Sequence, residues 1–365
     1  MKILFLTNHL NTGGITSYLL SLTKGLAQNR HSVYVASAGG NCQSLIESCG
    51  AKHINLGFRT KSEIDPRIYL SLDGLKKFII QENIDIIHAQ TRVMQVMGHF
   101  LSAMTGISLI TTCHGFFKPR FFRRLFPCWG RAVIAISKPV QEHLLKDFHV
   151  KPENIFVIAN GIDVNRFQPT TQALREQKRK QWNVTAKKVV GIVARLSDVK
   201  GIDVLLQSMS QVVKQYPDVL LMIVGEGPEL NRLVAMADQL NLAKHVRFEN
   251  IVNQTPDVLP IFDVFVMPSR QEGLGLSVME AQACALPVVA SRVGGLVDLI
   301  EEERTGYLVP SDNSEILAQR IIEVLNNPLQ AQKVGAAART QIIEKFSLTQ
   351  MVEATEKVYE QHSGR

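Results

Sequence analysis

Strand-like apolar runs alternate with helical patterns along almost the whole chain, in two successive series. The first series comprises residues 3–6, 33–36, 84–88, 108–111, 132–136 and 155–158. The second comprises residues 189–193, 220–224, 246–248, 264–267, 288–290 and 306–309. Continuous apolar strands separated by helices are typical of parallel sheets that are covered on both faces. We therefore predict an α/β fold with two doubly wound, Rossmann-like domains.

A polar stretch at residues 168–180 separates the two series and marks the expected domain boundary. We expect an N-terminal domain over residues 1–165, a second domain over residues 166–346, and a polar helix that starts at about residue 347. A length of 365 residues suits two domains, each with ample core.

The cysteines and the lengths of the apolar runs argue against a secreted, a zinc-binding or a membrane-spanning protein. The cysteines are odd in number and dispersed, and no two form a C-x-x-C pair, which argues against a disulfide framework or a zinc site. The first apolar run is too short for a signal-peptide core. No apolar stretch approaches the roughly 18 residues that span a bilayer. We therefore expect a cytoplasmic protein.

Two carboxylates, Glu272 and Glu280, flank a segment with two glycines and a serine. An apolar run precedes the segment and a helix-like stretch follows, which predicts a strand, a glycine-rich turn and a helix start. Glycines let the backbone approach a ligand, and the free N–H groups of a first helical turn bind anions. Carboxylates beside such a site suit sugar hydroxyls. The alternative is a solvated glutamate in a turn and an ordinary helical glutamate.

Two cations, Arg195 and Lys200, lie on one loop between a buried strand and a helical pattern that starts at Ile202. Open α/β sheets bind ligands at the carboxyl ends of their strands. An arginine fork and a lysine point charge at that edge suit a diphosphate. The alternative is a pair of ordinary surface cations.

Histidines occur near three expected strand ends, and one of them precedes a glycine. His114 ends an apolar strand and is followed by Gly115, which favours a functional role over a structural one. We interpret His9 and His88 as structural.

Several short segments together, in their order along the chain, resemble the retaining glycosyltransferases of family 4, which have the GT-B fold. They are Gly13-Gly14, Thr112-Cys113-His114-Gly115, Ala159-Asn160-Gly161-Ile162-Asp163, Arg195 with Lys200, Gly225-Glu226-Gly227-Pro228, and the segment from Glu272 to Glu280, which matches the family's E-x7-E motif. The chain departs from the pattern at three places: Leu274 replaces the commonest phenylalanine, Ala194 replaces a glycine, and Asn250 replaces a frequent glycine in the base-contact loop.

The resemblance implies two Rossmann-like domains that face each other across a cleft, with the C-terminal helix (about 347–365) packed back on the first. It implies that the first domain serves the acceptor and the second binds the donor. The implied donor-binding residues are Gly14, Gly225, Ile251, Gly275, Leu276, Ser277 and Glu280. The implied catalytic residues are His114, Glu272, Arg195 and Lys200.

The reaction that the resemblance implies is retaining transfer of a sugar from a uridine-linked diphosphate sugar to an acceptor hydroxyl. The implied acceptor is a saccharide or a lipid-linked cell-envelope glycan. Arg195 and Lys200 would stabilise the leaving diphosphate, Glu280 would hold the ribose, and Glu272 and His114 would hold the sugar. The chain contains no D-x-D triplet. We therefore expect no metal and no cofactor beyond the donor, which is a co-substrate.

The basic charge, +7 for the whole chain, is concentrated at residues 116–131, which carry five cations and no acid among five phenylalanines and a tryptophan. Aromatic side chains interleaved with cations suit an anionic membrane surface. The residues that we expect to make this contact are Lys118, Arg120, Phe121, Phe122, Arg123 and Arg124. The alternative is an amphipathic helix packed in the first domain. Single-stranded nucleic acid would also use aromatic stacking, but no nucleic-acid module surrounds the window, so we expect no such partner.

Two further functions are compatible with the same segments. A nucleotide-sugar isomerase on this architecture would turn over the donor without an acceptor. A non-catalytic module would bind the sugar nucleotide or the membrane and would neither hydrolyse nor transfer the sugar. The complete set of Arg195, Lys200, Glu272 and Glu280 favours an enzyme.

Overall fold

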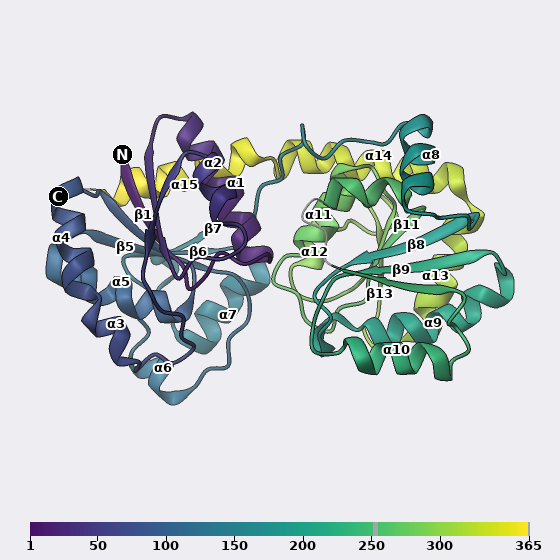
Figure 1. The fold of residues 1–365 in the computed structure, drawn as a ribbon, viewed down its shortest axis with the longest axis horizontal. Helices are drawn as coiled ribbons and strands as arrows, with labels where there is room; N and C mark the ends of the chain where they lie inside the picture. The colour runs from purple at the N-terminus through teal and green to yellow at the C-terminus, as the bar shows by residue number, and fades with distance from the viewer. Residues whose placement is uncertain (251–254, 364–365) are drawn as a thin grey trace. The chain divides into compact units, whose positions relative to one another are not determined.

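The structure is a computed structural model that describes residues 1–250 and 255–363 and, at Phe121 and Phe122, the backbone alone. The chain divides into two compact units (Figure 1). Unit 1 is Met1–Gly161 with Leu348–Arg365, and unit 2 is Ile162–Ser347. The fold class that the apolar runs predict is confirmed, because each unit is built on one parallel sheet with helices on its faces.

Unit 1 contains, among the described residues, a parallel sheet of seven strands in the order β3-β2-β1-β4-β5-β6-β7. The strands are β1 (Lys2–Leu6), β2 (Ser32–Ser37), β3 (Ala51–Asn55), β4 (Ile86–Ala89), β5 (Ser108–Cys113), β6 (Ala132–Ala135) and β7 (Ile155–Val157). The helices are α1 (Gly14–Gln28), α2 (Gln43–Ser48), α3 (Pro66–Leu70), α4 (Leu72–Glu82), α5 (Arg92–Thr105), α6 (Phe121–Leu125), α7 (Lys138–Phe148), the 3₁₀ turn η1 (Pro152–Asn154) and α15 (Leu348–His362).

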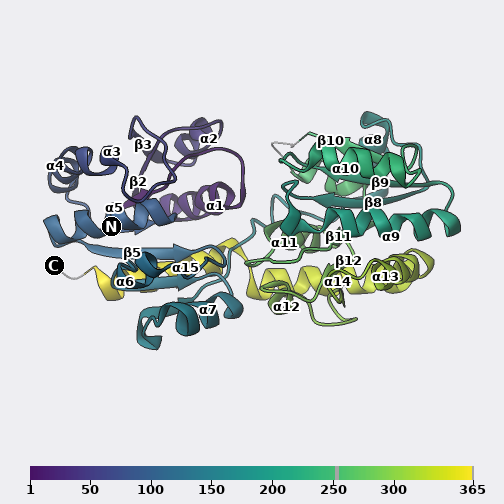
Figure 2. The ribbon, with the colours of Figure 1, turned by 90° about the horizontal axis from the view of Figure 1, so that it is seen from below.

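The central strand β1 shows why the sheet is covered on both faces. Its alternate residues Ile3 and Phe5 join a core with α1 and α15. Leu4 and Leu6 join a second core with α3, α4 and α5. Figure 2 shows helices on both sides of this sheet. The run is continuously apolar because both faces of the strand are buried.

Strand β3, at the edge of the sheet, is not among the runs that the sequence analysis singled out. Its sequence A-K-H-I-N is only half apolar, and Lys52 and Asn55 are exposed. An edge strand has one neighbour, so it needs less apolar surface than a central strand. Its pairing with β2, from Val33↔Ala51 to Ser37↔Asn55, defines it instead.

The last helix, α15, completes the core of unit 1. A Cβ atom on Gly25 of α1 would lie 2.3 Å from Cγ2 of Val352, so the two helices need a glycine at their contact. The N–H of Gly161 donates to Sδ of Met351 at 3.0 Å. The hydroxyl of Tyr359 lies 2.7 Å from Nδ1 of the buried His88. These contacts tie the C-terminal segment to strands formed from the first half of the chain.

Unit 2 contains, within its described residues, a parallel sheet of six strands in the order β10-β9-β8-β11-β12-β13. The strands are β8 (Lys188–Val193), β9 (Val219–Val224), β10 (Val246–Glu249), β11 (Val264–Met267), β12 (Val288–Ser291) and β13 (Tyr307–Val309). The helices are α8 (Gln172–Gln181), α9 (Ile202–Gln215), α10 (Leu230–Gln239), α11 (Leu276–Ala283), α12 (Leu296–Leu299), α13 (Ser314–Asn326) and α14 (Pro328–Lys345). Three short 3₁₀ turns are η2 (Asp198–Lys200), η3 (Thr255–Asp257) and η4 (Leu259–Ile261).

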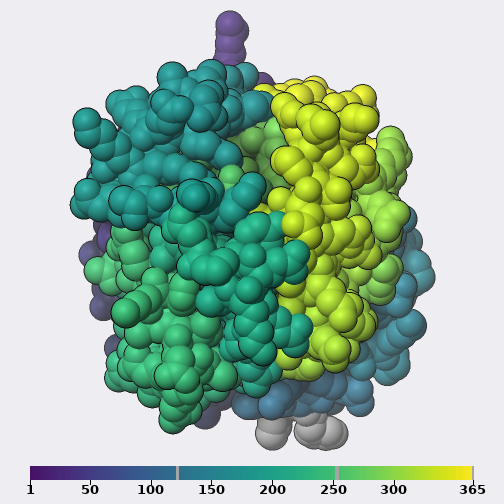
Figure 3. All heavy atoms as spheres, turned by 90° about the vertical axis from the view of Figure 1, so that its right-hand side faces the viewer, coloured from purple at the N-terminus to yellow at the C-terminus, as the bar shows by residue number. Residues whose placement is uncertain are grey.

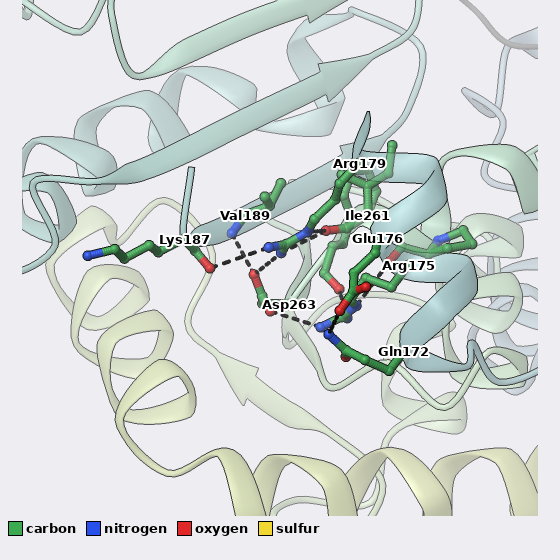
Figure 4. Close-up of polar contacts among 10 residues, drawn as sticks. Gln172, Arg175, Glu176, Arg179, Lys187, Val189, Ile261 and Asp263 are labelled. Carbon is green, nitrogen blue, oxygen red and sulfur yellow. Dashed lines mark hydrogen bonds and ion pairs between the residues drawn. The ribbon is translucent and has the colours of Figure 1, made fainter. Parts of the chain in front are cut away.

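The polar stretch between the two apolar series forms most of helix α8. None of the residues of this helix is buried. Arg175 and Arg179 of this helix both pair with Asp263, at 3.1 and 2.7 Å (Figure 4). Asp263 also accepts the N–H of Val189 at 2.7 Å. The cluster therefore joins α8 to the starts of β8 and β11. The space-filling view shows this teal segment at the surface of unit 2 (Figure 3).

Candidate active site

The glycine-rich segment forms a turn between β11 and α11, as its pattern predicts. Gly275 is the N-cap of α11 and has φ of 103°, a left-handed conformation that glycine adopts without strain. Leu276 and Ser277 are the first residues of the helix. Their backbone N–H groups lack partners within the helix, as at any helix start, so the turn presents donors to an anion.

A second glycine pair, Gly294-Gly295, packs against the backbone of this turn and was not among the predicted site residues. The N–H of Gly295 donates to the carbonyl of Glu272 at 3.0 Å. A Cβ atom on Gly294 would lie 1.9 Å from that carbonyl oxygen, and Gly294 has φ of 47°. The two glycines thus let the turn and the residues before α12 pack backbone to backbone. The signal in the sequence is a glycine pair shortly after β12.

The structure brings Lys200 and Glu272 into direct contact, although they are far apart in sequence. Nζ of Lys200 lies 2.5 Å from Oε2 of Glu272, and the hydroxyl of Ser269 donates to the same oxygen at 3.3 Å. The two side chains are 20% and 13% exposed, so the pair is shielded without being closed to solvent. A cation and a carboxylate therefore lie side by side at this edge of the sheet.

Close backbone packing fixes the loop that carries Arg195 and Lys200. A Cβ atom on Gly201 would lie 2.0 Å from the carbonyl oxygen of Pro268, at the start of the glycine-rich turn. A Cβ atom on Gly225 would lie 1.9 Å from the carbonyl oxygen of Ala194. This contact gives Gly225 a structural reason to be glycine, beside its predicted contact with the donor. The side chain of Arg195 is exposed at the end of β8.

Glu280 lies one turn into α11 and is only partly exposed. Burial raises the pKa of this carboxyl to about 7, against the opposing effects of a hydrogen bond with Thr255 and of the charge on Arg166. Such a group would gain from hydroxyl donors that stabilise its ionised form. Ile251, the predicted base contact, lies outside the described residues.

In unit 1, His114 lies just after the carboxyl end of β5. Its Nε2 lies 2.8 Å from Oε1 of Gln90, which follows the adjacent strand β4, and its ring contacts Tyr18 edge-on at 4.9 Å between centroids. Burial lowers the pKa of His114 to about 3. The imidazole is therefore neutral near pH 7, which suits a hydrogen-bonding role and not a proton-transfer role.

Three buried side chains lie behind His114 and link it to the C-terminal helix. Nε2 of His88 lies 2.7 Å from the hydroxyl of Thr112, and Tyr18 lies 3.4 Å from the same hydroxyl. With the contact between His88 and Tyr359, these bonds form a chain from α15 to Tyr18, which contacts His114. Burial lowers the pKa of His88 to about 3, and the nearby His114 lowers it by a smaller amount. His88 is thus a structural histidine, as predicted.

Gly14 is the first residue of α1, after the N-cap Gly13. A Cβ atom on Gly14 would have no atom within 4 Å, and its φ is not positive. The packing of unit 1 therefore does not require glycine here. This open space is compatible with the predicted approach of a ligand to the backbone.

The basic and aromatic window of unit 1 is only partly packed. Leu125 and Phe126 are 61% and 59% exposed, and Lys118, Arg120 and Arg124 are also exposed. Arg123 is different: it is 17% exposed, lies 3.4 Å from Glu63 and stacks over the ring of Phe117 at 5.2 Å. Arg123 is thus paired within unit 1. This pairing argues against the membrane contact that we predicted for it. The side chains of Phe121 and Phe122 lie outside the described residues.

No helix in ranges 1–250 and 255–363 is both long and apolar enough to cross a bilayer. Over the same part of the chain, no three side chains of His, Cys, Asp or Glu gather in a way that could hold a metal ion.

Two family profiles match successive parts of the chain. The profile described as Glycosyltransferase Family 4 matches residues 12–166. The profile described as Glycosyl transferases group 1 matches residues 174–341. The two matches correspond closely to units 1 and 2.

Curated relatives are similar over parts of the chain that range from about half to more than three quarters. One is the GDP-mannose-dependent alpha-(1-6)-phosphatidylinositol monomannoside mannosyltransferase of Mycolicibacterium smegmatis, 34% identical over 188 residues, which is 49% of either chain. The match thus spans about half the length of that relative. Another is the UDP-Gal:alpha-D-GlcNAc-diphosphoundecaprenol alpha-1,3-galactosyltransferase of Escherichia coli, 25% identical over 79% of this chain and 78% of that one.

A solved structure has the same fold over nearly the whole chain. The Anabaena protein HepE, crystallised with UDP and glucose, aligns with a TM-score of 0.88 and 23% identity. The alignment covers 99% of this chain and 100% of that one. At this level of identity the likeness concerns the fold.

Proposed function

Since the chain belongs to the family 4 type of glycosyltransferases with the GT-B fold, we propose that it transfers a sugar, with retention, from a nucleotide diphosphate sugar to an acceptor hydroxyl. The observation that carries the proposal is the contact between Lys200 and Glu272 beside the start of α11. In the proposal, Lys200 of this pair binds a phosphate, Glu272 binds a sugar hydroxyl, and the backbone N–H groups at the start of α11 add donors for the same ligand.

The proposed mechanism assigns each group to one part of the donor. Negative charge grows on the diphosphate as the glycosidic bond breaks, and preorganised donors stabilise that charge most. Lys200, Arg195 and the first turn of α11 would supply them. Glu272 would accept hydrogen bonds from the sugar hydroxyls, and Glu280 from the ribose hydroxyls. In this proposal the side-chain cations do the work that a divalent metal does elsewhere.

His114 would contact a hydroxyl of the donor sugar as a neutral imidazole. Its low pKa supports this role, because a neutral ring can donate at one nitrogen and accept at the other. With Nε2 engaged by Gln90, Nδ1 is the nitrogen left for the sugar. A role in protonating the leaving group is not part of the proposal.

We propose uridine as the donor base and a lipid-linked glycan as the acceptor class. One relative uses UDP-galactose and the other GDP-mannose, so both bases belong in the test. The names of both relatives describe acceptors attached to lipid, a phosphatidylinositol and a diphosphoundecaprenol. The exposed Leu125, Phe126 and neighbouring cations support peripheral binding to the inner face of the cytoplasmic membrane.

The proposal is tested with the purified protein and a panel of UDP- and GDP-sugars, scored first by thermal shift. A donor that stabilises the protein is then offered with lipid-linked acceptors, and NMR reads the anomeric configuration of the product. We expect product with the donor's configuration, and the same rate in excess EDTA. Inversion would refute retention, loss of activity in EDTA with recovery in magnesium would refute metal independence, and binding of no sugar nucleotide would refute the function itself.

A further inference from the structure

Arg270 connects the two loops of unit 2 that carry the proposed donor-binding groups. It lies in the turn after β11, two residues before Glu272. Its backbone N–H donates to the carbonyl of Val199 at 2.8 Å, within the turn η2 that ends at Lys200. Its side chain also contacts η2 and the start of α9.

Every nitrogen of the Arg270 guanidinium donates within the protein. Nη1 and Nη2 donate to the two carboxylate oxygens of Asp203, at 3.0 and 2.9 Å. Nη1 also donates to the carbonyl of Asp198 at 2.7 Å, and Nε donates to Asp312 at 2.7 Å. The side chain is 25% exposed. Because its nitrogens are already engaged, Arg270 is suited to hold loops in place and not to bind phosphate.

The contacts join three segments that are separate in sequence: η2 with the start of α9, the turn before α11, and the loop before α13. The bidentate pair with Asp203 is the most shielded part, since Asp203 is 18% exposed, whereas Asp198 and Asp312 are more than half exposed. Exposed ion pairs add little stability. The planar guanidinium of Arg270, held by two carboxylate oxygens, nonetheless fixes the orientation of the two loops. A lysine cannot make this bidentate contact.

We propose that Arg270 is a positioning residue that sets the place of Lys200 relative to Glu272, and thereby makes unit 2 prefer nucleoside diphosphates to monophosphates. This inference rests on the proposed function. Lys200 on η2 pairs directly with Glu272, so a shift of η2 would change the distance between the two groups. A displacement of a functional group by about 1 Å can lower the rate of a reaction by about a hundredfold.

The chain offers a matched control in Arg320 of α13. Arg320 also contacts three carboxylates, those of Glu302, Glu303 and Glu323, and it is 22% exposed. None of these contacts involves η2 or the turn before α11. Arg320→Gln should therefore remove a similar ion cluster without moving Lys200.

The test measures the dissociation constants of UDP, UMP, GDP and GMP for the full chain, its R270Q and R270K variants, and R320Q. For the base that binds, R270Q should lower the preference for the diphosphate by about tenfold or more, R270K by less, and R320Q not at all. A preference within twofold of the parent in R270Q would overturn the inference alone. Binding of neither diphosphate by the parent would instead refute the proposed function.

Hydrogen exchange supplies a readout that needs no nucleotide. R270Q should speed amide exchange at residues 198–201, while R320Q should leave it unchanged. Equal exchange in R270Q and the parent would overturn the positioning role whatever the ligand is. Should R270Q not fold, Asp203→Asn removes one side of the bidentate pair and carries the same two measurements.

Discussion

Replacing Glu280 by glutamine should stabilise the protein at neutral and alkaline pH while it weakens donor binding. Burial raises the pKa of this carboxyl from 4.5 to about 7, so the folded state disfavours the ionised form. Glutamine has nearly the same shape and no charge to bury. The same charge is the one that we propose for the ribose hydroxyls, so stability and function should move in opposite directions.

The size of the effect follows from the shift in pKa. Between pH 4.5 and 7 the folded state binds more protons at Glu280 than the unfolded state does, so stability falls as the pH rises through this window. Each pKa unit corresponds to 1.36 kcal/mol, and a shift from 4.5 to about 7 gives a loss of about 3 kcal/mol. The loss is absent below pH 4.5 and complete above pH 7.

The assay is urea unfolding of the parent and of Glu280→Gln at pH 5 and pH 8. Other groups titrate in both proteins, so the difference between the two isolates Glu280. We expect the variant to gain about 2.5 kcal/mol relative to the parent between these conditions, since most but not all of the titration lies between them. Glu360→Gln, at an exposed position of α15, is the control substitution.

An equal pH dependence in the parent and in Glu280→Gln would refute the reasoning, because the carboxyl would then have the same pKa in both states. Binding should behave in the opposite sense. Donor hydroxyls favour the ionised form, so donor affinity of the parent should rise as the pH rises through about 7. The variant should bind more weakly and lose this dependence.

Three further predictions concern separate parts of the molecule. Lys200→Ala should slow turnover by raising the activation free energy by about 2–4 kcal/mol, as the loss of an oxyanion donor does in other enzymes. Circular dichroism should show an intact fold, and near-normal turnover would refute the assignment. Gly14→Ala should leave stability unchanged or higher, because nothing lies near the added methyl group, yet lower donor affinity in calorimetry; Gly74→Ala, equally open within α4, should leave affinity unchanged. Replacing Arg120 and Arg124 by glutamate should abolish most co-sedimentation with anionic vesicles at low salt, since the Debye length is about 10 Å at 0.1 M, and equal binding of the parent to neutral vesicles would contradict the electrostatic part.

The sequence alone predicts those parts of the fold that depend on continuous apolar burial. Central strands such as β1 and β11 lie where the runs predict, because both their faces are covered. Edge strand β3 could not be predicted in this way, since Lys52 and Asn55 face solvent and its pairing with β2 defines it.

The candidate site shows the same division. The turn before α11 is encoded locally, by glycines at the positions that need them. The contact between Lys200 and Glu272 joins residues far apart in the chain, and only the folded sheet brings them together. The support from Gly294 and Gly295 and the cluster around Arg270 also depend on neighbours that are distant in sequence, so no local pattern announces them.

The place of α15 in unit 1 has a consequence for synthesis on the ribosome. The first 161 residues emerge early, but their core lacks Val352, Met351 and Tyr359 until the last helix has been made. All of unit 2 is translated in between, at about 5–20 residues per second. Unit 2 is continuous in sequence and needs no segment outside Ile162–Ser347, whereas unit 1 without α15 leaves the apolar side chains of α1 uncovered. A released chain that ends at Ser347 should therefore contain a protease-resistant unit 2 and a protease-sensitive unit 1.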